Sequence, residues 1–126
     1  MCQIKRKKIL TLKMIFCFDI DNTICKTKGK NYRNAKPKKD VINLINQLFD
    51  NGHTIKMFTA RFMGRNNDNV KLAHKKGYNS TLRQLKKWKL KFHKLIMGKP
   101  SFDILVDDKA LGFKRSDIQK LKKFLK

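Results

Sequence analysis

The chain contains no glutamate, and its 9 acidic residues, all aspartates, stand against 32 lysines and arginines, which leaves a formal net charge of +23. No run approaches the ~18 apolar residues of a membrane span. No small-residue cleavage site follows the basic N-terminus, which excludes a signal peptide. The cysteines, Cys2, Cys17 and Cys25, are an odd set without metal-binding spacing and imply no disulfide framework. These absences predict a soluble, cytoplasmic protein.

Length and composition fit one globular domain. The chain has 126 residues, of which 40% are hydrophobic, enough for one core. We interpret residues 1–13 as a basic N-terminal extension and residues 14–126 as the domain, with a start at Met14 as the alternative. The sequence shows no internal repeat or linker.

The positive charge predicts attraction to polyanions such as nucleic acid, anionic membranes or phosphorylated substrates. The excess is mostly lysine and is accompanied by many asparagines and isoleucines, so a compositional bias explains it equally well. Composition alone leaves both a nucleic-acid-binding face and a uniform basic coat open.

Short apolar runs predict strands at 14–18, 54–58, 94–97 and 102–106. The first run is nearly all apolar, which is typical of a parallel strand covered on both faces.

Helical patterns lie between these runs. A helix over 40–52 has Asp40 as its N-cap and Gly52 as its stop. Further helices are predicted within 63–76 with Gly77 as its stop, over 80–88 with Ser80 as its cap, and over 116–126 with Ser116 as its cap. The alternation predicts an α/β fold, a three-layer, Rossmann-like, doubly wound parallel sheet with right-handed crossovers.

Polar side chains follow the end of each predicted strand, where ligands bind in such sheets. They are Asp19 and Asp21 after the first strand, Thr59 after the second, Lys99 after the third, and Asp107 and Asp108 after the fourth. The fold should gather them into one cleft.

This set suits phosphoryl transfer, which needs a nucleophile, a proton carrier and positive charge near the transferring oxygens. Asp19 and Asp21 can lie on one side of the chain, so one can attack phosphorus while the other protonates the leaving oxygen. The remaining carboxylates would repel them unless a cation intervened, and Mg²⁺ prefers such oxygen ligands. Thr59 can donate to the phosphate, and Lys99 can balance its charge.

Each feature also has a structural explanation when it is taken alone. An Asp-x-Asp pair at a strand end is commonly an Asx-turn or a cap, and "VDDK" is commonly a solvated turn. Thr59 is a frequent type of strand-terminal residue, and Lys99 is one lysine among many. Four such features in order, each after its own strand, favour the chemical interpretation.

At these residues the sequence resembles the haloacid dehalogenase (HAD) superfamily of phosphohydrolases. The motifs are "DIDNT" at 19–23, "FTAR" at 58–61, Lys99 in "GKP", and "VDD" at 106–108. The resemblance extends from Met14 to the end of the chain. Within the superfamily the chain is similar to small phosphatases of capsular or surface polysaccharide synthesis, which implies a sugar phosphate as substrate.

The resemblance implies a role for each matching residue. Asp19 would be the nucleophile that forms an aspartyl-phosphate, and Asp21 the general acid/base. Phosphate would be held by Thr59, Lys99, Asn22 and Ala60. Mg²⁺ would be bound by Asp19, the main-chain carbonyl of Asp21, and Asp107. Supporting roles would fall to Asp108, acting through water or by orienting Lys99, and to Arg61 and Thr23. For Arg61, contact with a second anionic group of the substrate and a plain ion pair both stay open.

The intervals between the motifs leave no room for a cap domain of the kind that superfamily members often carry. An open site takes a bulky substrate, such as a nucleic-acid end or a phosphoprotein, or borrows a lid from a second subunit of a homo-oligomer.

The leading expectation is therefore a cap-less, Mg²⁺-dependent phosphatase acting on a phosphorylated small molecule. The first alternative is a polynucleotide-end phosphatase that holds DNA or RNA by its basic surface. The second is a catalytically idle nucleic-acid-binding module.

Overall fold

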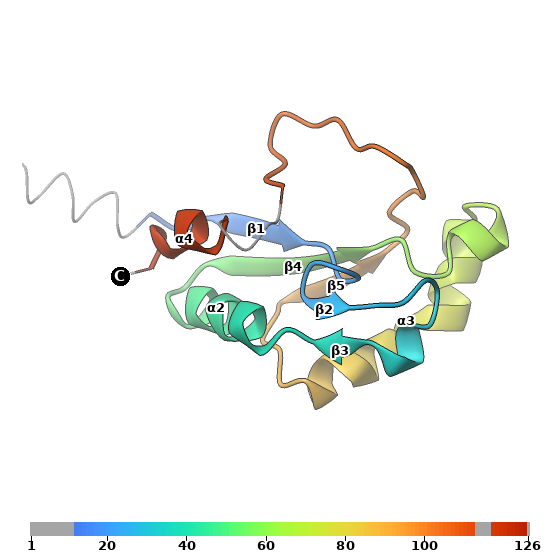
Figure 1. The fold of residues 1–126 in the computed structure, drawn as a ribbon, viewed down its shortest axis with the longest axis horizontal. Coiled ribbons are helices and arrows are strands. Elements are labelled where there is room, and N and C mark those ends of the chain that lie inside the picture. The colour runs from blue at the N-terminus through green and yellow to red at the C-terminus, as the bar shows by residue number, and fades with distance from the viewer. Residues whose placement is uncertain (1–11, 113–116, 126) are drawn as a thin grey trace, which may run out of the picture.

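The computed structural model describes residues 12–112 and 117–125, so the predicted extension 1–13 lies almost entirely outside the described residues (Figure 1). The main sheet is parallel, with strand order β1-β4-β5; its strands are β1 (Ile15–Phe18), β4 (Thr54–Thr59) and β5 (Lys94–Met97). A second, antiparallel pair is formed by β2 (Cys25–Lys26) and β3 (Lys36–Pro37). The predicted parallel α/β arrangement is confirmed.

Helices α2 (Lys39–Asp50) and α3 (Val70–Lys87) connect strands, and α4 (Asp117–Lys122) follows the last one. The 3₁₀ turns are η1 (Tyr32–Asn34) and η2 (Gly64–Asn66). None of the helices within the described residues is long and apolar enough to cross a membrane.

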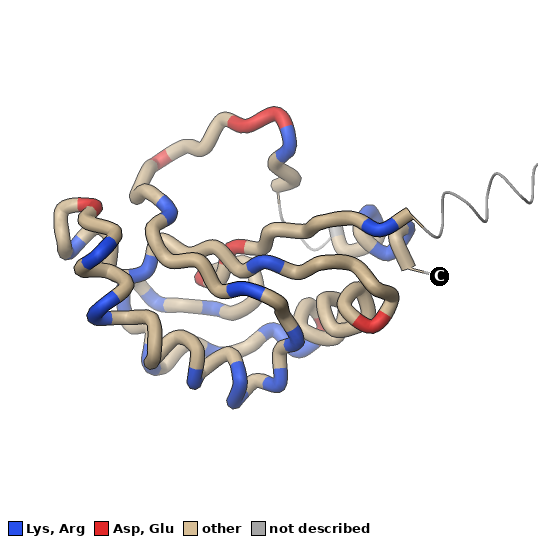
Figure 2. The backbone as a smooth tube through the Cα atoms, turned by 180° about the vertical axis from the view of Figure 1, so that it is seen from behind, with Lys and Arg blue, Asp and Glu red and all other residues tan. Residues whose placement is uncertain are grey.

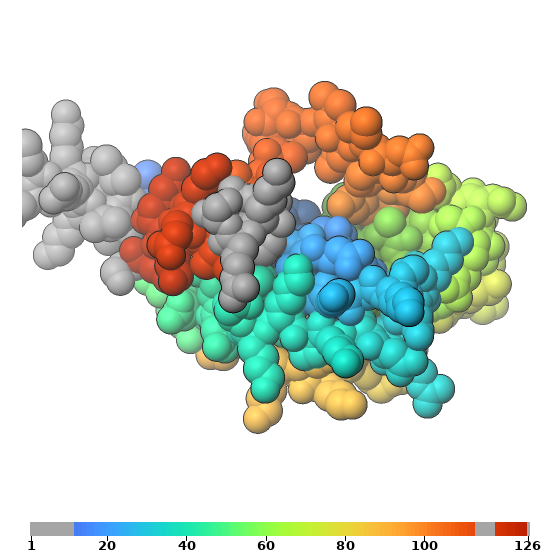
Figure 3. Space-filling model, in the orientation of Figure 1, coloured from blue at the N-terminus to red at the C-terminus, as the bar shows by residue number. Residues whose placement is uncertain are grey.

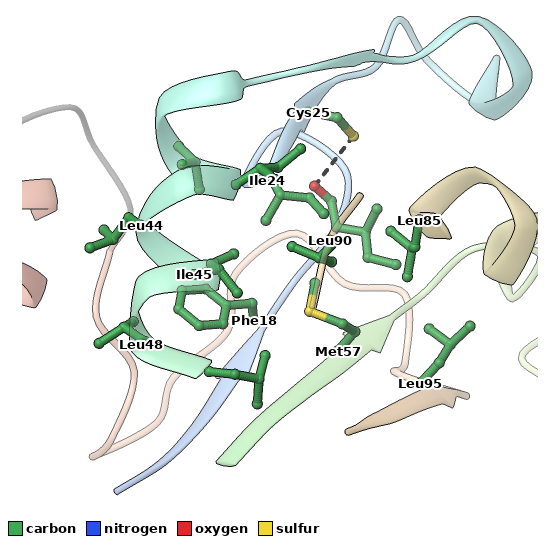
Figure 4. Close-up of a cluster of buried hydrophobic side chains, with 14 of the residues drawn as sticks. Phe18, Ile24, Cys25, Leu44, Ile45, Leu48, Met57, Leu85, Leu90 and Leu95 are labelled. Carbon is green, nitrogen blue, oxygen red and sulfur yellow. Dashed lines mark hydrogen bonds between the residues drawn. The ribbon is translucent and has the colours of Figure 1, made fainter. Parts of the chain in front are cut away.

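The core lies between the sheet and the helices α2 and α3. Phe18 of β1 is in register with Met57 of β4, and Met57 with Leu95 of β5, so these three side chains share one face of the sheet. Figure 4 shows Ile45 of α2 and Leu85 of α3 above the same face. Each such buried apolar side chain contributes about 1.5–3 kcal/mol of transfer free energy.

The opposite face of the sheet is less covered. Ile15 is 66% exposed and Cys17 is exposed, whereas Phe58 and Ile96 on the same face are half-buried. The doubly wound prediction requires helices on both faces. Within residues 12–112 and 117–125, helices α2 and α3, which follow β1 and β4 in the chain, both cover the face that carries Met57.

Helix α2 agrees with the predicted apolar stripe but differs at its N-terminus. Asp40 is not the N-cap, because the helix begins at Lys39 and the cap position is Lys38. The Asp40 carboxylate instead accepts from the amide of Val41 at 2.9 Å. Gly52 follows the helix with φ of 91°, a conformation that a glycine adopts without strain.

The prediction of two helices between β4 and β5 was wrong, because α3 runs without a break from Val70 to Lys87. Gly77 is not a helix stop, since it is buried inside α3 against the ring of Phe62. Ser80 is not a cap, since its hydroxyl donates to the carbonyl of Gly77 at 3.1 Å. Tertiary packing against Phe62 overrides the local stop signal of glycine.

The predicted strand at 102–106 is absent. Residues 102–112 form an arch that stands off from the body of the protein, drawn in orange in Figures 1 and 3. Ile104 is 81% exposed and Val106 is 91% exposed on this arch. Within the described residues no strand therefore pairs with the outer edge of β1. The predicted cap Ser116 lies outside the described residues, and the final helix, α4, is shorter than predicted.

Candidate active site

The chain leaves β1 through a tight turn that separates the first two aspartates. Ile20 is fully buried, and its carbonyl accepts from the amides of Thr23 at 3.1 Å and Ile24 at 3.0 Å. Asn22 has φ of 63°, in the left-handed region that asparagine tolerates. Its side-chain oxygen accepts from the amide of Thr27 at 3.1 Å. The turn thus anchors Ile20 in the core and leaves Asp19 and Asp21 half-buried on either side.

Asp21 forms a two-point ion pair with Arg61. The guanidinium Nε and Nη2 donate to the two carboxylate oxygens at 2.9 Å each. The Arg61 side chain is 2% exposed and that of Asp21 is 21% exposed. The Thr27 hydroxyl also donates to the Asp21 carboxylate. Of the two roles considered for Arg61, the structure shows the ion pair.

Asp19 is the more accessible carboxylate, and its partner is Lys99. The ammonium of Lys99 lies 3.6 Å from the Asp19 carboxylate, and the side chains are 13% and 35% exposed respectively. Burial raises the pKa of Asp19, while the charge of Lys99 opposes that rise. The amide of Lys99 donates to the carbonyl of Thr59 at 3.1 Å, which ties the segment after β5 to the end of β4.

Thr59 is the last residue of β4 and Ala60 follows it, close to the predicted strand end, but the Thr59 side chain is fully buried. Its hydroxyl oxygen accepts from the amide of Arg61 at 3.1 Å. In this arrangement Thr59 stabilises the loop that carries Arg61, and Ala60 is half-buried beside it.

Asp107 and Asp108 do not join this group. Both are exposed on the arch, and Figure 2 shows that the acidic positions of the arch lie apart from those after β1. Asp107 accepts from the amide of Lys109 at 3.0 Å, and this hydrogen bond holds the pKa of Asp107 below its usual value. The aspartates stay apart because the segment that precedes them is not paired with β1.

The residues present supply part of a magnesium site. Asp19 and the carbonyl of Asp21 are oxygen donors of the kind that Mg²⁺ prefers. Asp107, the third predicted ligand, lies on the arch. Across the part of the chain that the structure describes, no three carboxylate, thiol or imidazole groups gather as a metal cluster. In this arrangement the predicted ligands therefore do not form a complete Mg²⁺ site.

Sequence reasoning missed three side chains that shape the site. Thr27 and Cys25 lie against the Asp21 carboxylate, with the thiol sulfur 3.8 Å from it. Burial raises the pKa of the Cys25 thiol. Gln84, from α3, accepts from Arg61 at 2.6 Å. No local pattern marks Gln84, because it meets Arg61 only through the packing of α3.

Neither a protein-family profile nor a curated protein sequence matches this chain. A crystal structure of an MCSG target from Vibrio cholerae is similar, with a TM-score of 0.73 and 24% sequence identity. The similarity covers 87% of this chain and 96% of that chain. At this identity the likeness concerns the fold alone.

Proposed function

We propose that this protein is a phosphomonoester hydrolase of the HAD type, without a cap domain, that works through an aspartyl-phosphate. One observation carries the proposal. A half-exposed carboxylate, Asp19, lies at the carboxyl end of a parallel strand with the ammonium of Lys99 3.6 Å away. A nucleophile needs such access, and a phosphate needs such a counter-charge.

In the proposed first step a carboxylate oxygen of Asp19 bonds to phosphorus while the bond from phosphorus to the alcohol oxygen breaks. In the second step water attacks the aspartyl-phosphate, releases inorganic phosphate and restores the Asp19 carboxylate. Asp21 would act as the general acid/base: in the first step it gives its proton to the departing alcohol oxygen, and in the second step it takes a proton back from the attacking water. A leaving group that departs readily as an anion, such as a phenolate, needs little of this help in the first step.

The proposal includes Mg²⁺, which when bound would offset the charge of the carboxylates and the phosphate. It would be held by Asp19, the main-chain carbonyl of Asp21, and Asp107. Because Asp107 lies on the arch, the proposal also includes pairing of segment 102–106 with the outer edge of β1, as a fourth strand of a HAD-like sheet. The exposure of Ile104 and Val106, both apolar, supports this addition.

The first test is hydrolysis of 4-nitrophenyl phosphate with and without Mg²⁺, comparing the wild type with Asp19→Asn. Loss of the nucleophile at nearly constant volume should abolish turnover and leave the folded state intact, which a thermal melt would check. Turnover retained by Asp19→Asn would contradict the mechanism.

A second test addresses the arch. Val106 is 91% exposed here, so Val106→Lys should not change the melting temperature if the arch stays as described. If activity requires the fourth strand, pairing of that strand would bury residue 106. A lysine there instead of valine would raise the free energy of pairing by about 1.5–3 kcal/mol or more, and turnover should fall at least tenfold. Leu111→Lys, on the same arch but outside 102–106, is the control. Equal activity of the two variants would contradict the strand pairing.

A further inference from the structure

A basic cleft of about 600 Å³ opens between η1, the loop after β4, and α3. Five exposed cations line it: Lys30, Arg33, Arg65, Arg83 and Lys87. No carboxylate belongs to its lining. The positive charge of the chain is widely spread, but in this cleft cations from separate segments line the same cavity.

The acidic residues of the described chain do not neutralise this cluster. The ion pairs among residues 12–112 and 117–125 join Asp21 to Arg61, Asp50 to Lys91 and Asp19 to Lys99. None of them involves one of the five cleft cations. A ligand that carries several negative charges would relieve the repulsion among the five cleft cations.

Aromatic rings lie among these cations. Tyr32, Phe62 and Trp88 line the cleft, and the Tyr32 and Phe62 ring centres are 5.3 Å apart. The guanidinium of Arg65 is 5.4 Å from the centre of Tyr32 and 4.7 Å from that of Phe62. Rings and guanidinium planes on which bases can stack, beside cations that follow a phosphate backbone, are the recurring elements of single-strand binding sites.

The cleft also adjoins the candidate active site. Arg61 forms part of its lining and binds Asp21 on the other side of the same guanidinium. Gln84 accepts from Arg61 at 2.6 Å and donates to the carbonyl of Tyr32 at 2.7 Å. One hydrogen-bonded chain therefore runs from Asp21 to the wall of the cleft.

We infer that this cleft binds the end of a single-stranded nucleic acid, with its phosphates on the five cations and a base against the aromatic rings. A lone phosphate would use one or two of these cations and none of the rings. The binding inference stands by itself, whereas the claim that the bound strand presents a terminal phosphate to Asp19 as a substrate rests on the proposed function.

The test measures binding of a six-nucleotide thymidine oligomer with a terminal phosphate, using the Asp19→Asn protein so that no turnover interferes. Trp88 is the single tryptophan of the chain and lines the cleft, so its fluorescence reports occupation directly. Saturable quenching is expected, together with an affinity that falls as salt rises.

A matched pair of double variants separates the cleft from general charge. Arg83→Ala with Lys87→Ala removes two cleft cations, and Lys75→Ala with Lys86→Ala removes two exposed cations of α3 that do not line the cleft. Both variants lose the same charge and place alanine in the same helix. The cleft variant should bind on the order of tenfold more weakly, and its salt slope should fall by about 0.7 per lost phosphate contact. The control should bind within about twofold of the parent, since its lysines make no phosphate contact.

Equal loss in both variants would mean that the charge acts as a uniform coat, and would overturn the inference. If inorganic polyphosphate bound as tightly as the oligomer, the bases would add nothing to the affinity and the single-strand assignment would be overturned. Tighter binding to anionic vesicles than to the oligomer would also overturn it. Oligomer binding by a protein that hydrolyses no phosphate ester would sustain the cleft and refute the phosphatase. Hydrolysis of 4-nitrophenyl phosphate without oligomer binding would support the phosphatase and refute binding in the cleft.

Discussion

The Arg61–Asp21 pair allows a sharp test of the site's architecture, by the substitution Arg61→Met. The variant fills similar volume but leaves the Asp21 carboxylate, 21% exposed, without the two hydrogen bonds of 2.9 Å that it receives from Arg61. It also removes the 2.6 Å bond to Gln84. Breaking a buried pair on one side costs about 3–5 kcal/mol, and the partial exposure of Asp21 favours the lower end. A loss of about 3 kcal/mol lowers the melting temperature of a domain this size by roughly 10 °C.

The assay is thermal and urea unfolding of Arg61→Met, Asp21→Asn and the double variant. The double variant should be more stable than the sum of the single losses predicts, because removing both charges leaves neither unpaired. Arg65→Met is the control, since Arg65 is exposed on the same loop and its ring contacts are worth about 0.5–1 kcal/mol. If Arg61→Met loses no more stability than Arg65→Met, the ion pair does not hold the site together and the reasoning is refuted.

Two further predictions concern packing and pH. Gly77→Ala would ordinarily stabilise a helix by about 1 kcal/mol, but a Cβ at Gly77 would lie 2.6 Å from Cε2 and 2.9 Å from Cγ of Phe62. The variant should therefore lose about 1–3 kcal/mol in urea unfolding, and a gain would show that Phe62 moves aside freely. Because burial raises the pKa of Asp19 in the folded state, its ionisation opposes folding: the cost begins as the pH rises through the lower pKa of the unfolded chain and is complete above the folded-state pKa. Asp19→Asn should therefore melt higher than the wild type at pH 7, with the gain vanishing near pH 3, where the wild-type carboxyl is also neutral. A variant that melts lower at pH 7 would mean that attraction to Lys99 outweighs desolvation.

The local chain pattern determined much of the sheet and its edge. Apolar runs predicted the bounds of β1, β4 and β5 to within one residue, because the apolar pattern of a short segment reflects which of its side chains are buried. The stripe along α2 and the stop at Gly52 followed in the same way. Since carboxyl ends of parallel strands meet at one edge, the meeting of Asp19 with Lys99 was also foreseeable.

Contacts between distant segments decided the rest. Gly77 reads locally as a helix end, yet the ring of Phe62 fills the space beside it and α3 continues. Segment 102–106 reads as a strand, but a strand exists only where a partner edge receives it, and in this structure the arch stays unpaired. The sequence marked Arg61 but left its role open and gave no sign of Gln84; packing joins Arg61 to Asp21 and to Gln84 at the wall of the basic cleft. Sequence thus determined what each segment prefers by itself, whereas tertiary structure alone decided which segments meet, because burial and charge pairing depend on neighbours that no local pattern specifies.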